Sequence, residues 1–238
     1  DFRLQSLAGV RMYALISHSA LEGYLYDGNS WGQASDGGKG GWHLFSNSAL
    51  TGTLYSLSVY DDKLIVFGTI APIDGDQGSL PATGNQTLYW DGIHWELLSK
   101  YGFQPSSGGF VSYHDQLLTP SFGYQYGMGT FNGHAWKSFD QTKFTASVYS
   151  AAVYRDQLYI AGAFTKLAGN ADINYLARWN GSKWESVDKG FNNGPGVSLL
   201  VANDKLYIVG YFENVADNES ADRIVVWDGA NFSNLGNG

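Results

Sequence analysis

Short runs of alternating apolar and polar residues, separated by turn-forming residues, recur along the whole chain. The clearest are 151–162 and 199–210, in which β-branched and aromatic residues flank an Asp-containing dipeptide. Such a pair of runs predicts a β-hairpin, because Asp and Asn bond to their own backbone and tolerate left-handed conformations. Weaker copies occur at 58–68, 111–118 and 5–15. The pattern therefore predicts five hairpins, each formed by the first two strands of a repeated unit.

A second pattern follows each hairpin: an apolar or aromatic residue, Asp or Asn, Gly, two variable residues and an aromatic residue. Its glycines are spaced 64, 41, 48 and 48 residues apart, at Gly28, Gly92, Gly133, Gly181 and Gly229. The glycine supplies the positive φ that a tight turn needs, so this pattern predicts the third and fourth strands of each unit. Self-similarity at about 40–50 residues is typical of a β-propeller blade.

The two patterns together predict an all-β fold: a five-bladed β-propeller of four-stranded antiparallel blades. No long stretch has apolar residues at helical spacing, so almost no helix is expected. Because the repeats span nearly the whole chain, residues 1–238 are expected to form one single domain. The blades are expected at approximately 1–36, 50–100, 108–140, 147–189 and 196–238.

The last two units resemble a known repeat. The stretch from Leu158-Tyr159-Ile160-Ala161-Gly162-Ala163-Phe164 to Trp179-Asn180-Gly181-Ser182-Lys183-Trp184, with its echo at 206–235, resembles the repeat of fungal cortical polarity-marker proteins used in bud-site selection. The layout is also similar to kelch repeats. The polarity-marker repeats follow the scheme Leu-Tyr-x-Gly-Gly-x-Phe, a small polar loop, and an apolar-aromatic-Asn/Asp-Gly-x-x-Trp turn. This chain departs from it where the diglycine is reduced to Ala161-Gly162, and where Pro120 interrupts a strand of the third unit. The resemblance implies a non-catalytic extracellular domain and carries no catalytic residues.

Charge and cysteine content exclude several functions. The net charge is −8 and the chain has no cysteine. A phosphate backbone would be repelled, so nucleic acid is not an expected partner. No apolar run approaches the roughly 18 residues of a membrane span, so no membrane insertion is expected in this segment. The absence of cysteine excludes disulfides, thiolate zinc sites and cysteine nucleophiles.

Aromatic residues on long loops are the candidate ligand-binding residues. The connections between the second and third strands of a unit, and between units, are long, share one face by alternation, and are expected to carry function. Trp42, next to His43, is the one tryptophan outside the repeated slots, and Tyr124 and Tyr126 form a second aromatic loop. The alternatives are that Trp42 plugs the channel or covers the first blade, and that the two tyrosines complete a strand.

The other seven tryptophans occupy two repeated slots, which predicts a role in packing blade against blade. They are Trp31, Trp95, Trp136 and Trp184 in one slot, and Trp90, Trp179 and Trp227 in the other.

Metal and cofactor signals are sparse. Asp74 and Asp76 lie in a segment with the alternating oxygen and glycine character of a calcium loop, but Asn85 stands where an EF-hand has its bidentate Glu. The five histidines are scattered without metal-ligand spacing. The aspartates of the hairpin turns, such as Asp156 and Asp204, are expected to form turns. No cofactor is expected.

Glycosylation sequons favour a secreted or cell-surface protein. They begin at Asn85, Asn180, Asn218 and Asn231. Asn180 also has a turn-forming role by its place in the repeat, which leaves Asn85 and Asn218 as the glycosylation candidates. The expected location is extracellular or at the cell surface.

Three functions remain open. The first is a non-catalytic interaction domain that binds a protein partner through the loop face. The second is a glycan-binding lectin, which should repeat one set of aromatic and polar residues in every blade. The third is a glycoside hydrolase, which needs two carboxylates across a cavity. The inner strands supply mainly Ser and Ala and no carboxylate, so the protein is not expected to be an enzyme.

Overall fold

A computed structural model of the chain describes fifteen segments of the sequence. These are residues 4–7, 11–16, 22–26, 50–61, 63–72, 85–90, 95–98, 109–120, 127–140, 142, 144–167, 173–188, 190–191, 193–215 and 222–235. The chain divides into two compact units, Asp1–Gln104 and Pro105–Gly238, and each is described by itself. The expectation of one single domain stays a prediction.

The first unit contains two antiparallel sheets. One has three strands: β1 (Leu4–Leu7), β2 (Arg11–Ile16) and β3 (Glu22–Tyr26). The other has four: β4 (Leu50–Tyr60), β5 (Lys63–Pro72), β6 (Asn85–Trp90) and β7 (Trp95–Leu97).

The second unit contains three antiparallel sheets of four strands. The first consists of β8 (Val111–Tyr113), β9 (Gln116–Thr119), β10 (Gly129–Phe131) and β11 (Trp136–Ser138). The second consists of β12 (Val148–Tyr154), β13 (Gln157–Gly162), β14 (Leu176–Trp179) and β15 (Trp184–Ser186). The third consists of β16 (Gly196–Ala202), β17 (Lys205–Gly210), β18 (Ile224–Trp227) and β19 (Phe232–Asn234).

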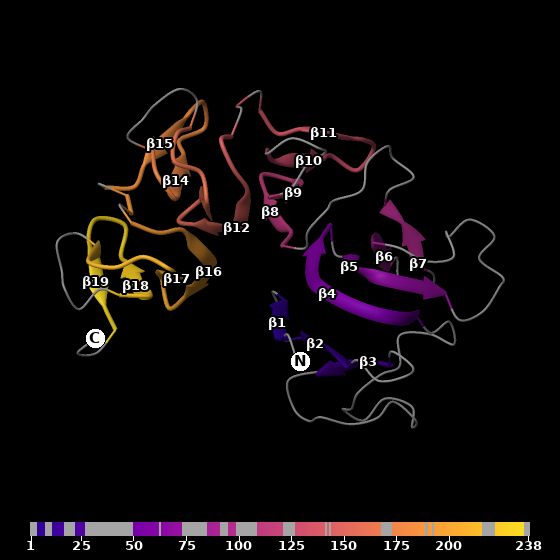
Figure 1. Ribbon diagram of the computed structural model, residues 1–238. Coiled ribbons are helices and arrows are strands. Elements are labelled where there is room, and N and C mark those ends of the chain that lie inside the picture. Colours follow the sequence, from indigo (N-terminus) through magenta and orange to yellow (C-terminus); the bar gives the residue numbers. More distant parts are fainter. Residues whose placement is uncertain are drawn as a thin grey trace. The chain divides into compact units, whose positions relative to one another are not determined.

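Every sheet is a meander in which the strands pair in chain order, as Figure 1 shows for each blade. This is the all-β architecture of a β-propeller with four-stranded antiparallel blades. The prediction of five four-stranded blades is corrected: four sheets have four strands, and β1–β3 has three strands in the described part of the chain. The sheet β1–β3 corresponds to the most degraded repeat of the sequence, in which Gly9-Val10 replaces the Asp-containing turn dipeptide. The fourth strand expected there, with Trp31, lies outside the described residues.

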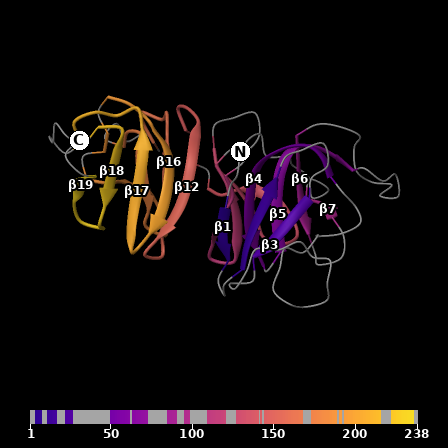
Figure 2. The same ribbon diagram turned by 90° about the horizontal axis from the view of Figure 1, so that it is seen from below.

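Within the second unit, blade packs on blade through two aromatic cores. The inner strands β12 and β16 lie side by side (Figure 2), and β8 also contacts β12. Trp227 is buried in one core with Tyr159 and Leu176 of the preceding blade. Trp184 is buried in the other with Leu118 and Met128 of the blade before it. These two tryptophans therefore have the packing role that the repeat predicts.

The turn between the first two strands of a blade is a two-residue type I′ turn. Tyr154 pairs with Gln157, and the two residues between them have positive φ: 48° at Arg155 and 59° at Asp156. The other described pairs behave alike, at His114-Asp115 and Asn203-Asp204. Positive φ at both central positions matches the right-handed twist of the flanking strands, which explains the choice of Asp, Asn and His in most of these positions.

The turn between the third and fourth strands is longer and is held by a side chain. Asn180 accepts hydrogen bonds through Oδ1 from the backbone N–H groups of Ser182 and Lys183, both at 3.0 Å. Asn132 and Asp228 do the same in their own blades. Positive φ is found only at the glycine that follows, for example 100° at Gly181. The Asp/Asn residue thus acts as an Asx-turn former while glycine alone takes the left-handed conformation.

The position of Pro120 also agrees with the prediction from the sequence. Strand β9 ends at Thr119, immediately before Pro120, because proline has no N–H for a sheet ladder. All elements named for the described residues are strands, and almost no helix was expected from the sequence.

Candidate functional site

Three inner strands carry the same β-bulge, each at the residue after the one that pairs with a glycine of the second strand. In β12 the register against β13 shifts between Val148 and Ser150, so Tyr149 is the extra residue. In β16 the shift makes Val197 the extra residue, and in β4 it is Tyr55. A bulge bends the strand and redirects a side chain, and bulges are over-represented next to active sites. All three bulged residues are exposed.

A glycine opposite each bulge makes this geometry possible. A Cβ atom on Gly162 would lie 2.3 Å from the carbonyl oxygen of Ser147, and one on Gly210 would lie 2.2 Å from that of Pro195. Gly68 has the same relation to Thr53, at 2.1 Å. No side chain fits at these distances, so the hairpins can approach closely only through glycine.

The residue after this glycine faces the bulge, and the next one is buried. Ala163 and Tyr211 each donate their backbone N–H across the hairpin, to the carbonyl oxygens of Ser147 and Pro195 at 2.9 Å. Phe164 and Phe212, one position later, are completely buried. In the sequence Gly-x-Phe the phenylalanine therefore anchors the chain after the second strand, and the middle residue is half-buried as Ala163 and exposed as Tyr211.

In one of these hairpins the bulged residue and the residue after the glycine are in side-chain contact. In the blade of β4–β7 the Tyr55 hydroxyl lies 3.0 Å from Thr69 Oγ1, and Thr69 is the residue after Gly68. In the last blade the aromatic residue has changed position, because Val197 occupies the bulge and Tyr211 follows the glycine. Each of these three hairpins thus presents one exposed tyrosine: Tyr55 at 43%, Tyr149 at 45% and Tyr211 at 66% exposure.

In the second unit these positions form what we call the tyrosine site, consisting of Tyr149, Val197 and Tyr211. They belong to neighbouring blades that are joined directly, since the Leu199 N–H donates to Ser150 Oγ at 3.1 Å. The site lies at the end of the blades opposite the type I′ turns, where the long connections leave. Aromatic rings with a hydroxyl at the tip can contact protein or sugar, because they combine a large apolar area with a hydrogen-bonding group.

The backbone after Tyr211 is held by polar contacts from the segment before β16 and from within the β17–β18 connection. Asn193 Oδ1 accepts the Glu213 N–H at 2.9 Å, and Asp222 Oδ1 accepts the Asn214 N–H at 2.8 Å. Arg223 forms an ion pair with Glu213 at 2.9 Å. Tyr211 therefore projects from an ordered support, which reduces the entropy cost of ordering it on binding.

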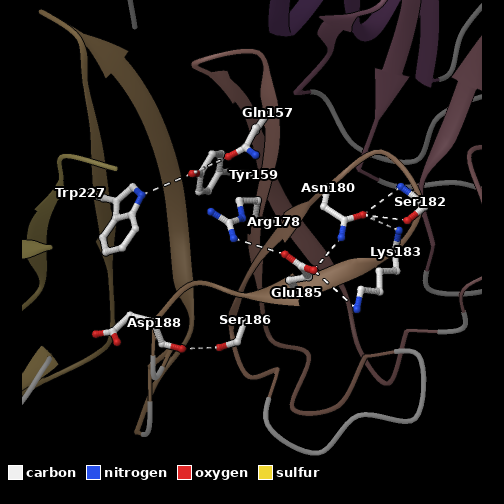
Figure 3. A network of polar contacts seen from close by, with 10 residues as sticks. All are labelled: Gln157, Tyr159, Arg178, Asn180, Ser182, Lys183, Glu185, Ser186, Asp188 and Trp227. Carbon is white, nitrogen blue, oxygen red and sulfur yellow. Dashed lines mark hydrogen bonds and ion pairs between the residues drawn. The ribbon is translucent and has the colours of Figure 1, made fainter. Parts of the chain in front are cut away.

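A separate polar network lies on the hairpin β14–β15 (Figure 3). Glu185 accepts hydrogen bonds from Asn180 Nδ2 at 2.6 Å and Arg178 Nη2 at 3.3 Å, and Lys183 Nζ lies 3.7 Å away. The hydrogen bond from Asn180, with further help from Arg178 and Lys183, holds the pKa of Glu185 below its ordinary value. An ionised carboxylate paired with two cations is a poor general acid, and the contacts of Glu185 link the two strands of this hairpin.

The structure does not describe most of the residues that the sequence singled out. Trp42, His43, Tyr124, Tyr126, Asp74, Asp76 and Asn218 lie outside the described residues. Asn85 is exposed at the start of β6, and its Oδ1 accepts a hydrogen bond from Thr69 Oγ1 at 2.8 Å. Asn180 is a turn former, as its place in the repeat predicted.

Neither a metal cluster nor a membrane span was predicted for the described segments. No group of three or more His, Asp or Glu side chains there could hold a metal ion. No helix in the part that the structure describes is long and apolar enough to cross a membrane.

The sequence did not point to the tyrosine site because Tyr149 and Val197 lie within strands and Tyr211 directly follows one, whereas binding residues were expected on the long loops. One signal was available: Gly210-Tyr211-Phe212 places a large aromatic residue where the preceding repeat has Ala163. The bulges themselves have no signature within one repeat, since Tyr149 looks like an ordinary strand residue.

Comparisons with known proteins support the fold alone. A scan against known protein families finds no match, and a search of curated proteins finds none. The chain is similar to the Pyrococcus horikoshii acylaminoacyl peptidase, with a TM-score of 0.58 and 12% identity over 97% of this chain. It is also similar to YjhT, with a TM-score of 0.53 and 12% identity over 98% of this chain. The chain spans 37% of the length of the peptidase and 82% of that of YjhT.

Proposed function

We propose that this chain is a non-catalytic interaction domain that binds a protein partner through the loop end of its blades. The observation that carries the proposal is the exposed tyrosine at this end of three hairpins: Tyr55, Tyr149 and Tyr211. Tyrosine is enriched in the residues that dominate binding energy at protein interfaces. It also contributes a large contact area while losing only two side-chain torsions.

The proposal includes the wider biological setting that the sequence suggested. It comprises a location at the cell surface or outside the cell, and the function of the polarity-marker repeats that the last two units resemble. The exposed side chain of Asn85 supports the location, because a glycan there would extend from the surface.

A lectin is the second candidate, and one observation favours it. An aromatic residue at the same end of several blades is what a repeat-encoded sugar site requires. The polar companions differ, however: Tyr55 lies beside Thr69, whereas the corresponding neighbours are Ala163 and Val197 in the other two blades. A repeated sugar site needs repeated hydrogen-bonding groups, so the differences favour a protein partner.

Site-specific photo-crosslinking tests the proposal. A photoreactive phenylalanine derivative replaces Tyr149 or Tyr211 in the protein produced in its native cells, and Lys205, exposed at the turn end of the same blade, is the control position. We expect a defined protein adduct from positions 149 and 211 and none from 205. For the purified partner, Tyr149→Ala and Tyr211→Ala should each raise the Kd at least about tenfold, whereas Lys205→Ala should not change it.

The same variants separate the two candidates. Adducts that form equally from position 205 would contradict the proposed surface. If no protein adduct forms and a glycan array gives hits that Tyr149→Ala and Tyr211→Ala abolish, the lectin candidate replaces the protein-binding one.

A further inference from the structure

Asn-Gly pairs occur at three places in the described part of the chain: Asn132-Gly133, Asn180-Gly181 and Asn193-Gly194. A further pair, Asn237-Gly238, lies outside the described residues. In such a pair the backbone nitrogen of glycine can attack the side-chain carbonyl carbon of asparagine, because glycine has no Cβ atom to hinder the approach. The three described pairs share this sequence, so the structure around each pair decides whether the reaction occurs in the folded protein.

The pair Asn193-Gly194 is held by close packing. Gly194 is buried, and a Cβ atom there would lie 2.2 Å from the carbonyl oxygen of Tyr211. Asn193 Oδ1 accepts the Glu213 N–H at 2.9 Å. Ring closure requires the peptide unit between asparagine and glycine to rotate toward the side chain, and the packed backbone around Gly194 leaves no room for this rotation.

The pair Asn180-Gly181 is exposed, but the side-chain amide of Asn180 is held at both ends (Figure 3). Its Oδ1 accepts the backbone N–H groups of Ser182 and Lys183, and its Nδ2 donates to Glu185 Oε1 at 2.6 Å. Nδ2 is the group that leaves as ammonia when the ring closes. A hydrogen bond to an ionised carboxylate is among the strong ones, so it opposes both the rotation of the amide and the loss of this nitrogen.

The pair Asn132-Gly133 is exposed and is held at one end only. Asn132 Oδ1 accepts the backbone N–H groups of His134 and Ala135, both at 3.1 Å. Its Nδ2 has no hydrogen-bond partner within the described residues. A Cβ atom on Gly133 would have no neighbour within 4 Å, so the peptide unit is free to rotate.

The difference between the two exposed pairs has one cause in the sequence. Glu185 directly follows Trp184, which pairs with Trp179, and Lys137 directly follows Trp136, which pairs with Phe131. Lys137 therefore occupies the position of Glu185 in the blade of β8–β11. An ammonium group accepts no hydrogen bond and cannot hold the amide nitrogen of asparagine.

We propose that Asn132 is a site of spontaneous deamidation in the folded protein, and that Asn180 and Asn193 are protected by their surroundings. The Gly133 nitrogen, after losing its proton to water or hydroxide, forms a bond to Cγ of Asn132, and the Cγ–Nδ2 bond breaks with release of ammonia. Water then opens the five-membered succinimide at one of its two carbonyl carbons, which gives aspartate or isoaspartate. The two hydrogen bonds that Oδ1 accepts favour ring closure, because they stabilise the negative charge that develops on this oxygen.

The two products should affect the turn differently. Aspartate at position 132 keeps it, because Asp228 stands at the equivalent position of the last blade and accepts the N–H groups of Ala230 and Asn231 at 2.8 and 2.7 Å. Isoaspartate does not keep it, because the backbone then runs through the former side chain and no Oδ1 is left to hold the turn. Isoaspartate should therefore loosen the hairpin β10–β11.

Peptide mapping by mass spectrometry tests the proposal. The full-length chain is incubated at physiological temperature and mildly alkaline pH, once folded and once in urea, and aspartate and isoaspartate are quantified at positions 132, 180 and 193. In the folded protein we expect Asn132 to deamidate at least about tenfold faster than Asn180, because the bond from Asn180 to Glu185 must break before the ring closes. In urea most of this difference should disappear. Equal rates in the folded protein, or the same ratio of rates in urea, would overturn the proposal, because the structure would then have no influence.

Two substitutions exchange the surroundings of the exposed pairs. Lys137→Glu supplies a carboxylate and should slow the reaction at Asn132, whereas Lys137→Ala supplies no acceptor and should leave the rate unchanged. Glu185→Ala should accelerate the reaction at Asn180, whereas Lys183→Ala, which keeps the bond to Glu185, should not. Unchanged rates in both Lys137→Glu and Glu185→Ala would overturn the proposal. None of these outcomes depends on the tyrosine site or its partner.

Discussion

Arg155 and Asp204, which occupy equivalent turns of two neighbouring blades, form a two-pronged ion pair. Arg155 Nε donates to Asp204 Oδ1 at 3.1 Å and Nη2 donates to Oδ2 at 2.5 Å. One blade earlier, His114 Nε2 lies 3.3 Å from Asp156 Oδ1 in the same relation. The first residue of one turn therefore contacts the second residue of the next turn, which links consecutive blades at this end of the second unit.

Replacement of Asp204 by asparagine should lower stability at neutral pH and remove part of its pH dependence. The hydrogen bond from Arg155 holds the pKa of Asp204 below its ordinary value in the folded protein. The stabilisation is therefore present above the unfolded pKa of about 3.9 and is lost as the pH falls through the lower folded value. Urea unfolding midpoints of wild type and Asp204→Asn should differ at pH 7 and converge at pH 2.

The effect should be small, because both side chains are more than half exposed. Added salt should reduce it further. In the variant Arg155→Gln, the additional replacement of Asp204 should have almost no effect. A midpoint difference that is unchanged between pH 7 and pH 2, or additive effects of the two replacements, would contradict this account.

Much of the fold was predictable because turn chemistry is local. Asp and Asn in the hairpin turns, and Gly181 or Gly229 after an Asx residue, mark the strands on both sides of each turn within a few residues. The three-stranded sheet β1–β3 was not predictable in the same way. Its repeat lacks the Asp-containing dipeptide of the first turn but keeps the second pattern up to Trp31, and the fourth strand which that pattern predicts falls outside the described residues.

Gly162→Ala should destabilise the protein by about 1–3 kcal/mol, because the new methyl group would meet the carbonyl oxygen of Ser147. The matched control is Gly127→Ala, since a Cβ atom there would have no neighbour within 4 Å. The control should change the free energy of unfolding by less than about 0.5 kcal/mol. Urea denaturation measures both values, and equal costs for the two variants would show that Gly162 is not required for close approach.

The candidate site was less predictable than the fold because it depends on register. Trp42, Tyr124 and Tyr126 were predicted to bind a ligand because they lie on long loops. The exposed tyrosines that the structure describes lie in or beside strands. Tyr149 is exposed because a bulge shifts it out of alternation, and a bulge depends on how two strands pair. Such a shift cannot be read from one strand alone.

Asp140→Ala should cost about 1–3 kcal/mol, because it leaves a buried indole N–H without its acceptor. Asp140 follows β11, and its Oδ2 accepts a hydrogen bond at 2.8 Å from Nε1 of Trp184, which lies in the next blade. Asp140→Asn retains an oxygen acceptor and should recover most of the loss. Thermal unfolding of the three proteins checks the order of stability, and a variant with asparagine as unstable as that with alanine would contradict the role of this bond.

Tyr211 and Phe212 are adjacent but should respond to alanine in opposite ways. Tyr211 is 66% exposed, so Tyr211→Ala should change the free energy of unfolding by less than about 0.5 kcal/mol. Phe212 is completely buried and stacks on Phe191, with ring centroids 4.2 Å apart, so Phe212→Ala should cost about 3–5 kcal/mol. Partner binding should show the reverse dependence: Tyr211→Ala should weaken it in a fully folded protein. If Tyr211→Ala destabilised the fold as strongly as Phe212→Ala, Tyr211 would be a packing residue and could not be assigned to a docking surface.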